Sequence, residues 1–286
     1  MTKNKTHIHW YPGHIAKAER QLKEMLSLVD VVIEVRDARI PVSSSYNNIE
    51  KLLGDKPRLL LLNKSDLVEL SELTEWINYL KKTTNLNIIA VDTKGNKDFN
   101  VIIKSVSDLA EPKIQALIEK GLLRRPARVM VVGMPNVGKS SIINKLTKSS
   151  KTKTGAKAGV TRQQQWVRIN PKVELLDTPG IIPTKQDDQN CALKLAFVSS
   201  VSENAYSPEP VAQELLNMLS SGNYKNIVMN HYKIEELTLE NIALSRKWLI
   251  KNEAPDTERT AKVILKDFRE GKIGKFILDT IPCTND

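Results

Sequence analysis

Gly133-Met-Pro-Asn-Val-Gly-Lys-Ser140 matches the pattern G-x-x-x-x-G-K-[ST] of a phosphate-binding loop. The apolar run Val129–Val132 precedes it and the helical pattern Ile142–Leu146 follows it, which is the strand–loop–helix context that the pattern requires. In such a loop, backbone N–H groups surround a phosphate, Lys139 neutralises the β- and γ-phosphates, and Ser140 offers its hydroxyl to Mg²⁺. The loop therefore predicts an α/β protein that binds a nucleoside triphosphate.

Short apolar runs bounded by polar or glycine-containing turns recur on both sides of this loop. Runs of this length are typical of buried parallel strands, and helical patterns separate most of them. We therefore expect a mostly parallel sheet with helices on both faces and a ligand at the carboxyl ends of the strands. The expected strands are Val31–Val35, Leu59–Leu62, Ile88–Val91, Val129–Val132, Val173–Leu176 and, more weakly, Trp166–Ile169. The expected helices between them are Ile15–Leu28, Asn47–Leu53, Ser71–Lys82 and Phe99–Glu119.

A second strand-end motif, Asn63-Lys64-Ser65-Asp66, matches the guanine-reading pattern N-K-x-D. The carboxylate of Asp66 can accept hydrogen bonds from guanine N1–H and from the exocyclic amine, whereas adenine presents no such pair of donors. We expect Asn63 to tie the base-binding loop to the phosphate loop and the stem of Lys64 to pack on the ring. The next strand ends at Val91-Asp-Thr93-Lys94, where a base-contacting turn is expected and the usual Ser-Ala-Lys pattern is matched loosely.

A third motif, Asp177-Thr-Pro-Gly180, follows the run Val173–Leu176 and matches D-x-x-G. This turn is expected to place Asp177 near Mg²⁺ and to bring the N–H of Gly180 to the γ-phosphate. Between the phosphate loop and this turn, Thr161 lies in a glycine-containing loop and is a candidate Mg²⁺ ligand when a γ-phosphate is present, as in a switch. The alternative for Thr161 is an ordinary loop hydroxyl.

The order of these motifs is unusual, because the guanine reader precedes the phosphate loop. In most GTPases the phosphate loop comes first. A circular permutation joins the old termini and opens a surface loop, so that the strand ends keep their places around one site. The permutation also makes the D-x-x-G turn the last motif before the C-terminal part of the chain, so a change at the γ-phosphate can move that part.

The pattern changes after Pro183, where amphipathic helices replace the strands. The expected helices are Asp187–Ser202, Glu209–Ser220, Leu239–Asn252 and Asp256–Glu270. We divide the chain into a circularly permuted G domain, residues 1–188, and a small all-helical domain, residues 189–286. The last helix places Ile264, Leu265 and Phe268 on one face, and its basic residues, Arg259, Lys262, Lys266 and Arg269, are expected to face solvent or RNA.

Basic residues are concentrated in one segment of the 286-residue chain, whose net charge is +10. Residues 113–172 hold fourteen Lys and Arg against one acidic residue. This excess predicts a polyanionic partner, and a solvated loop beside a nucleotide site is the alternative.

The two cysteines, Cys191 and Cys283, indicate neither a disulfide framework nor a zinc site, so a cytoplasmic setting is expected. No apolar run approaches the length of about 18 residues that a membrane span needs, and we expect a monomer without stable membrane association.

Together these segments resemble the circularly permuted ribosome-biogenesis GTPase A family (the YlqF type) over nearly the whole chain. The resemblance is carried by His9-Trp-Tyr-Pro-Gly-His14-Ile-Ala-Lys-Ala18, Asp30-Val-Val-Ile-Glu-Val-Arg-Asp-Ala-Arg39, the permuted motifs and Gly271-Lys-Ile-Gly-Lys275. It implies a GTPase that binds a late precursor of the large ribosomal subunit and hydrolyses GTP as the subunit matures and the factor is released. It also implies that the helical domain contacts ribosomal RNA.

The resemblance suggests a catalytic residue that spacing alone does not single out. Many GTPases place a water-orienting glutamine after the D-x-x-G turn, and here that position holds the apolar Ile181. The resemblance points instead to His14, whose neutral imidazole can accept a hydrogen bond from water, and a helix-capping role is the alternative. Asn136 resembles the asparagine with which some related GTPases bind K⁺ beside the phosphates, and shaping the loop is its alternative role.

These inferences define the expected site. The residues expected to bind GTP are Asn63, Lys64, Ser65, Asp66, Thr93, Asn136, Val137, Gly138, Lys139, Ser140, Ser141 and Gly180. The expected Mg²⁺ ligands are Ser140, Thr161 and Asp177, Asn136 is the candidate K⁺ ligand, and His14 is the candidate catalytic residue. Two other functions stay open at this stage, a GTP-dependent protein that handles transfer RNA and a non-hydrolysing interaction protein at a membrane surface.

Overall fold

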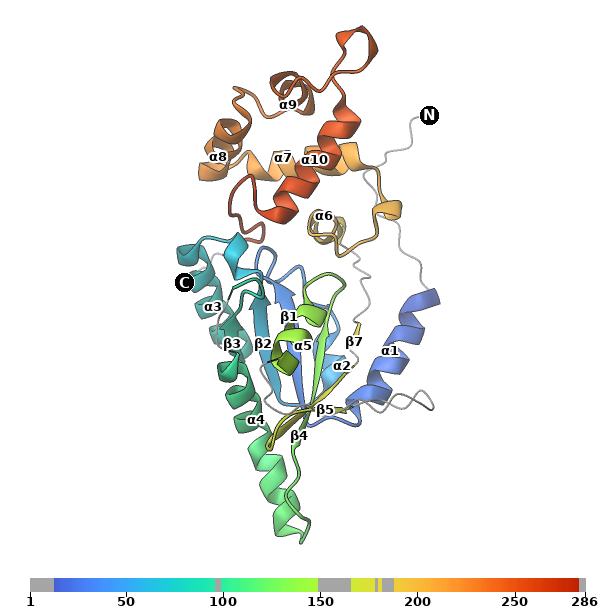
Figure 1. Cartoon of the computed structure of the whole chain (residues 1–286), viewed down its shortest axis with the longest axis vertical. Helices are drawn as coiled ribbons and strands as arrows, with labels where there is room; N and C mark the ends of the chain where they lie inside the picture. The colour runs from blue at the N-terminus through green and yellow to red at the C-terminus, as the bar shows by residue number, and fades with distance from the viewer. Residues whose placement is uncertain (1–12, 96–98, 149–165, 178–179, 182–187, 283–286) are drawn as a thin grey trace.

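The computed structural model describes residues 13–95, 99–148, 166–177, 180–181 and 188–282. A twisted sheet with helices around it forms one part, and helices at the carboxyl ends of its strands form the other (Figure 1). Among the described residues, the strands are β1 (Val31–Asp37), β2 (Arg58–Asn63), β3 (Asn87–Ala90), β4 (Ala127–Gly133), β5 (Trp166–Asn170), β6 (Val173–Leu176) and β7 (Gly180–Ile181).

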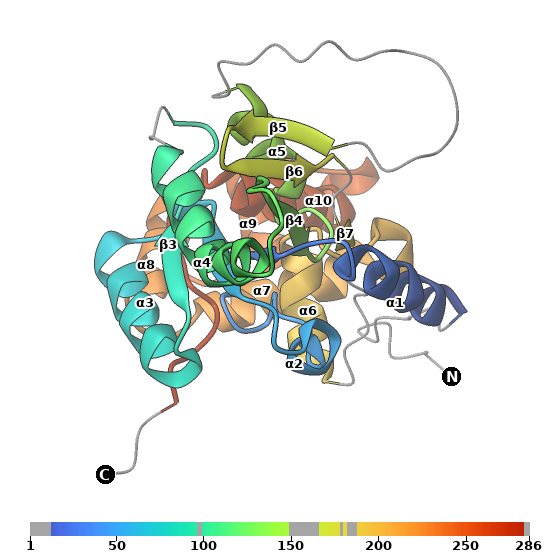
Figure 2. The same cartoon turned by 90° about the horizontal axis from the view of Figure 1, so that it is seen from below.

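The sheet has the order β3-β2-β1-β4-β6-β5, and β7 pairs with the end of β4 beyond β6. Every pairing is parallel except that of β5 with β6, which is antiparallel. The α/β prediction with a mostly parallel sheet is therefore confirmed. Its weakest expected strand, residues 166–169, is β5 at the edge, where an antiparallel hairpin needs only a short turn. Figure 2 shows β3 and β5 at opposite edges of the sheet.

Helices cover the sheet because its strands are buried on both faces. Along β2, Leu59 and Leu61 join the larger hydrophobic cluster, whereas Leu60 and Leu62 pack with Trp76 in a smaller one. This alternation follows from the two-residue period of a strand. The helices in this part are α1 (Gly13–Leu26), α2 (Ile49–Leu53), the 3₁₀ helix η1 (Ser65–Leu67), α3 (Leu70–Thr84), α4 (Asn100–Glu119) and α5 (Lys139–Lys148).

The rest of the described chain is helical. Its elements are α6 (Gln189–Phe197), η2 (Glu203–Ala205), α7 (Pro208–Leu219), α8 (Gly222–Tyr232), α9 (Leu239–Ser245), η3 (Lys251–Glu253) and α10 (Thr257–Glu270). Helix α10 buries the apolar face that the sequence predicts, with Ile264, Leu265 and Phe268 inside. None of the described helices is long and apolar enough to cross a membrane.

Two helix predictions in this part are wrong in extent, and one helix is not predicted. Residues 187–202 do not form one helix, because α6 ends at Phe197 and Ser199 has a left-handed φ of 63°. Residues 239–252 also do not, because Lys247 is left-handed and Leu249 bridges to Pro255. The sequence predicts no helix over α8, because glycine and asparagine favour turns, whereas Gly222 is the first residue of that helix.

The chain after α10 returns to the sheet and fastens the two parts together. The backbone N–H of Leu278 donates to the carbonyl of Arg39, and the N–H of Phe276 donates to the carbonyl of Leu67. The Asp279 carboxylate accepts hydrogen bonds from the backbone N–H groups of Val42 and Ser43. One continuous buried cluster also includes side chains of both parts. The helical part is therefore fixed on the end of the sheet where parallel strands place ligands.

Candidate nucleotide-binding site

The phosphate loop connects β4 to α5 in a conformation that requires glycine. Gly138 has a φ of +102°, and a Cβ atom there would lie 2.1 Å from the Nδ2 atom of Asn63. At Gly133 a Cβ atom would lie 2.5 Å from the carbonyl oxygen of Val35 on the neighbouring strand. Both contacts are shorter than atoms allow, so the two glycines let the loop pass closely over β1 and β2.

Asn63 joins the end of β2 to the phosphate loop. Its Nδ2 atom donates a 2.8 Å hydrogen bond to the carbonyl of Val137, and the side chain is buried. Its Oδ1 atom is also buried and accepts no hydrogen bond from the described residues. Because buried acceptors are rarely left unpaired, this atom fits a site that a ligand completes.

Lys139 lies at the first turn of α5 and is buried. Its Nζ atom donates a 2.7 Å hydrogen bond to the carbonyl of Met134, so the lysine is held across its own loop. Burial lowers the pKa of Lys139 to about 8, because the charged ammonium loses its water. A phosphate anion would favour the charged form, so the residue is prepared for an anionic ligand.

The guanine-reading residues lie in the turn after β2. Lys64 has a left-handed φ of 62°, and its Nζ atom lies 2.8 Å from the buried carboxylate of Asp37. The carboxylate of Asp66 lies 3.5 Å from Nζ of Lys94 on the following turn. The N–H of Ser65 donates to the carbonyl of Val91, which holds the two turns side by side.

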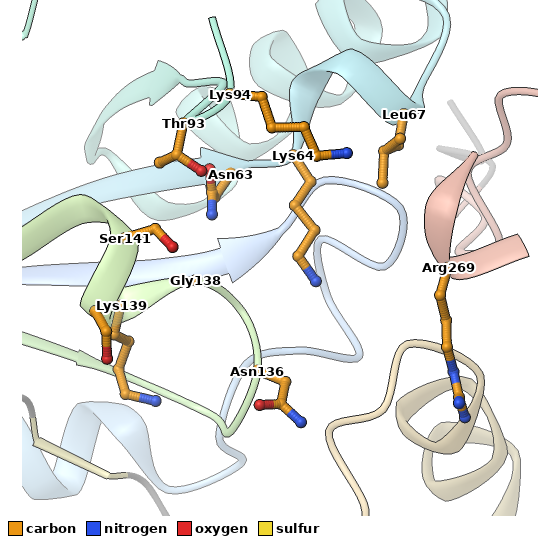
Figure 3. A pocket seen from close by; sticks show the side chains of 11 residues that line it. Asn63, Lys64, Leu67, Thr93, Lys94, Asn136, Gly138, Lys139, Ser141 and Arg269 are labelled. Carbon is orange, nitrogen blue, oxygen red and sulfur yellow. The ribbon is translucent and has the colours of Figure 1, made fainter. Parts of the chain in front are cut away.

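A cavity of about 510 Å³ lies between these turns and the phosphate loop (Figure 3). Most of the expected GTP-binding residues border it. The lining residues are Asn63, Lys64, Leu67, Thr93, Lys94, Asn136, Gly138, Lys139, Ser140, Ser141 and Arg269. The volume is that of a small-molecule site, and the lining combines glycine, amides, hydroxyls and cations, which suits a nucleoside phosphate.

The remaining expected residues are placed less directly. Ser65, Asp66 and Val137 belong to the same loops but do not border the cavity. Asp177 is exposed after β6, and Gly180 pairs with Val132 beside the start of the phosphate loop.

Two expected residues cannot be placed from the structure. Thr161 lies outside the described residues. His14 is the second residue of α1, a helix that contacts β7, and its side chain also lies outside the described part.

Three cavity residues are absent from the sequence-based set, and one of them, Lys94, lies in the expected base-contacting turn. Leu67 follows the guanine reader directly and could have been included by proximity. Arg269 comes from α10 in the helical part, about 130 residues after the phosphate loop, and a basic residue on an amphipathic helix carries no signal for this position. Its guanidinium donates to the carbonyls of Ala196 and Phe197 and to the hydroxyl of Tyr206. It is therefore a fixed wall between the cavity and α6, which corrects the expectation of a solvent- or RNA-facing side chain.

Comparisons with known proteins agree with this arrangement. The family described as 50S ribosome-binding GTPase matches residues 128–247. The chain is 36% identical to the ribosome biogenesis GTPase A of Bacillus cereus over 279 residues, which cover 96% of this chain and 94% of that protein. It is 32% identical to the mouse mitochondrial ribosome-associated GTPase 1, with 94% of this chain and 89% of that protein covered.

Solved structures show the same relationship. The GNP-bound YlqF from Thermotoga maritima is 29% identical and has a TM-score of 0.65, with 93% of this chain and 100% of that chain covered. A GDP-bound YlqF structure has a TM-score of 0.67 at 28% identity, with 91% and 98% covered. The guanine reader precedes the phosphate loop in this chain, as expected of a permuted GTPase. On similarities that cover nearly its whole length, the chain belongs to the ribosome biogenesis GTPase A family, whose members are GTP-hydrolysing enzymes acting in ribosome biogenesis.

Proposed function

We propose that this GTPase binds a late precursor of the large ribosomal subunit through its ribosomal RNA and couples GTP hydrolysis to maturation and to its own release. One observation carries the proposal: Arg269 of the helical part borders the same cavity as the phosphate loop. A nucleotide in that cavity touches both parts of the chain, so the presence of a γ-phosphate can alter how the helical part is held. Such a link is required of a factor whose affinity for RNA depends on the bound nucleotide.

The residues divide the chemical work. In the proposal, Lys139 and the loop N–H groups bind the phosphates, Asp66 selects guanine and Gly180 contacts the γ-phosphate. Ser140, Asp177 and Thr161 would hold Mg²⁺, which would neutralise phosphate charge, and Asn136 would hold K⁺. The Nδ2 atom of Asn136 donates to the carbonyl of Ser199, which leaves its oxygen to face a cation. His14 orients the attacking water, because the side chain of Ile181 has no group that could do so.

The RNA contact is proposed for fewer basic residues than the sequence indicates. Arg124 pairs with Glu111. Arg125 pairs with Asp30, and Arg128 pairs with Glu174. These arginines therefore neutralise acids of the fold rather than present a free patch. We assign phosphate contacts to the segment 145–172, much of which lies outside the described residues, and to the helical domain, residues 189–286.

Co-sedimentation tests the proposal. Full-length protein is mixed with precursor or mature large subunits, with transfer RNA, or with vesicles, in the presence of a non-hydrolysable GTP analogue or of GDP. We expect retention on precursor particles with the analogue, loss with GDP, and weakening as salt rises, because phosphate contacts release counterions. Retention that does not depend on the nucleotide, or that is strongest on transfer RNA or vesicles, would contradict the proposal.

The role of His14 needs a separate measurement. His14→Ala should lower GTP turnover on precursor particles by about 100-fold, the range of a lost general-base contact, and leave the GDP dissociation constant unchanged. Arg20→Ala, an exposed change on the same helix, is the matched control and should leave both quantities unchanged. Equal turnover of the two variants would remove His14 from the mechanism.

A further inference from the structure

A buried line of charges connects the guanine-reading turn to the helical part. Asp37, at the end of β1, is fully buried and contacts two cations. Its carboxylate forms an ion pair with Nζ of Lys64 at 2.8 Å. Its two oxygens also accept hydrogen bonds of 2.9 and 2.8 Å from the guanidinium of Arg39. Burial by itself raises the pKa of Asp37, but Arg39 and Lys64 outweigh it and hold the pKa well below its usual range. The three side chains are therefore charged together.

Arg39 extends this line to the last helix. Its Nη1 atom donates to the carbonyl of Phe268 at 3.2 Å and to that of Arg269 at 3.5 Å. Its guanidinium also lies over the Phe268 ring, 5.2 Å from the centroid. These carbonyls belong to the last turn of α10, where a cation is favourable, and the Phe268 carbonyl also accepts the N–H of Gly271.

The other side of the guanine-reading turn also touches the end of α10. Gly271 follows the helix with a φ of +73°, and a Cβ atom there would lie 2.5 Å from Cδ2 of Leu67. Leu67 borders the cavity, and its carbonyl accepts the N–H of Phe276. The turn is therefore linked to the C-terminal segment directly at Leu67 and, at Lys64, through Asp37 and Arg39.

We propose that Asp37 and Arg39 are positioning residues for nucleotide binding, because Asp37 sets the place of Lys64 while Arg39 fixes the end of α10 on the same carboxylate. This inference rests on the proposed guanine pocket. Its consequence is reciprocal: docking of α10 strengthens guanine-nucleotide binding, and bound nucleotide strengthens docking of α10 by the same factor. Neither residue lines the cavity.

Arg39→Lys in the full-length chain tests the inference. Lysine keeps the charge but cannot donate to both Asp37 oxygens and to the α10 carbonyls at once. We expect the dissociation constant for fluorescent N-methylanthraniloyl GDP to rise by about tenfold or more, as for loss of a buried charge-assisted contact. Hydrogen exchange supplies the second readout: GDP should slow exchange of residues 264–278 in the unmodified chain and should lose this effect in the variant.

The control is the arginine partner of a second buried aspartate, Asp30, which directly precedes β1. Asp30 accepts hydrogen bonds of 2.7 and 3.0 Å from Arg125, and neither residue lines the cavity. Arg125→Lys also weakens a two-pronged contact to a buried aspartate, but Arg125 is one third exposed and Asp30 keeps Lys113 as a partner. It should therefore lower the melting temperature by less than Arg39→Lys does and leave GDP affinity unchanged. This comparison separates positioning from a general loss of stability.

Three outcomes would overturn the inference. In the first, Arg39→Lys and Arg125→Lys change GDP affinity equally. In the second, Arg39→Lys binds GDP normally. In the third, which is decisive even if the variant does not fold, GDP leaves exchange of residues 264–278 in the unmodified chain unchanged. Failure of the guanine pocket itself would appear differently, as an Asp66→Asn variant with unaltered GDP affinity.

Discussion

The two ends of the central strands use the same residue types for different purposes. At the amino end of β1, the buried Asp30 is held by Arg125, and at the carboxyl end the buried Asp37 is held by Arg39. Cations bring the pKa of Asp30 to about 2 against the opposing effect of burial, and they hold the pKa of Asp37 below its usual range. Asp37 alone also binds a cavity-lining lysine, Lys64.

This difference shows that an excess of positive charge does not locate a binding surface. At the amino end, Arg124, Arg125 and Arg128 each face an acidic partner, so their charges are used within the fold. At the carboxyl end, Lys139 is buried without an acidic partner among the described residues and donates to a carbonyl. Charge that the fold leaves uncompensated is what an anionic ligand can use.

The largest expected effect on GDP binding comes from comparing alanine substitutions at two glycines, which lie near the two ends of β4. Gly138→Ala should abolish GDP binding and lower the unfolding free energy by about 3 kcal/mol or more, because the new Cβ atom meets Asn63 as well as an unfavourable φ. Gly121→Ala, at a φ of +83° with open space around it, should cost about 1 kcal/mol and leave binding unchanged. Calorimetric binding and thermal unfolding measure both. Comparable binding by the two variants would refute the tight loop geometry.

The next effect tests base selection at the carboxyl end. Asp66→Asn should weaken GDP binding about 100-fold, because two charge-assisted hydrogen bonds to guanine are lost, and should improve binding of xanthosine diphosphate. Lys94→Ala is the matched change on the ion-paired neighbour, and it should alter affinity by less than about fivefold because its ammonium is mostly exposed. A variant at Asp66 that keeps its preference for GDP would show that another residue reads the base.

The sequence predicts the carboxyl end of the sheet better than the helical part. Glycines, Asn63 and Lys139 are required by local chemistry, so their motifs indicate the loop and its neighbours directly. The wall made by Arg269 depends on how α10 docks on residues far away in the chain, and no local pattern encodes that contact. Helix α8 was missed for a related reason: Gly222 and Asn223 are turn residues by propensity, and tertiary packing of Val228 and Tyr232 overrides it.

Lys139 also predicts a pH effect that the amino end should lack. Its pKa in the free chain is about 8, so above this pH the lysine must take up a proton when a phosphate binds. GDP affinity should therefore fall by up to about tenfold per pH unit above that point. Because the pKa of Lys139 is below the usual lysine value of 10.5, the folded chain binds fewer protons than the unfolded chain in this window. The contribution of Lys139 to stability accordingly rises with pH, so the weaker binding is not caused by a loss of this contribution.

Calorimetry in buffers of different ionisation enthalpy measures this proton uptake directly. Lys145→Ala, on the same helix, should keep the pH dependence, since Lys145 donates to the carbonyl of Gly95 rather than bordering the cavity. GDP affinity that stays constant between about pH 7.5 and about pH 9 would mean that Lys139 is charged before the ligand arrives.

The smallest expected effect lies at the amino end. Arg124 pairs with Glu111 at 2.6 Å, and both side chains are more than one third exposed. Exposed pairs contribute little, so Arg124→Ala should change the unfolding free energy by less than about 0.5 kcal/mol and leave GDP affinity unchanged. It should also leave the salt dependence of binding to precursor particles unchanged, because the charge of Arg124 is already neutralised by Glu111. A reduced salt slope would instead place Arg124 against RNA phosphate and would make the amino end a second binding surface.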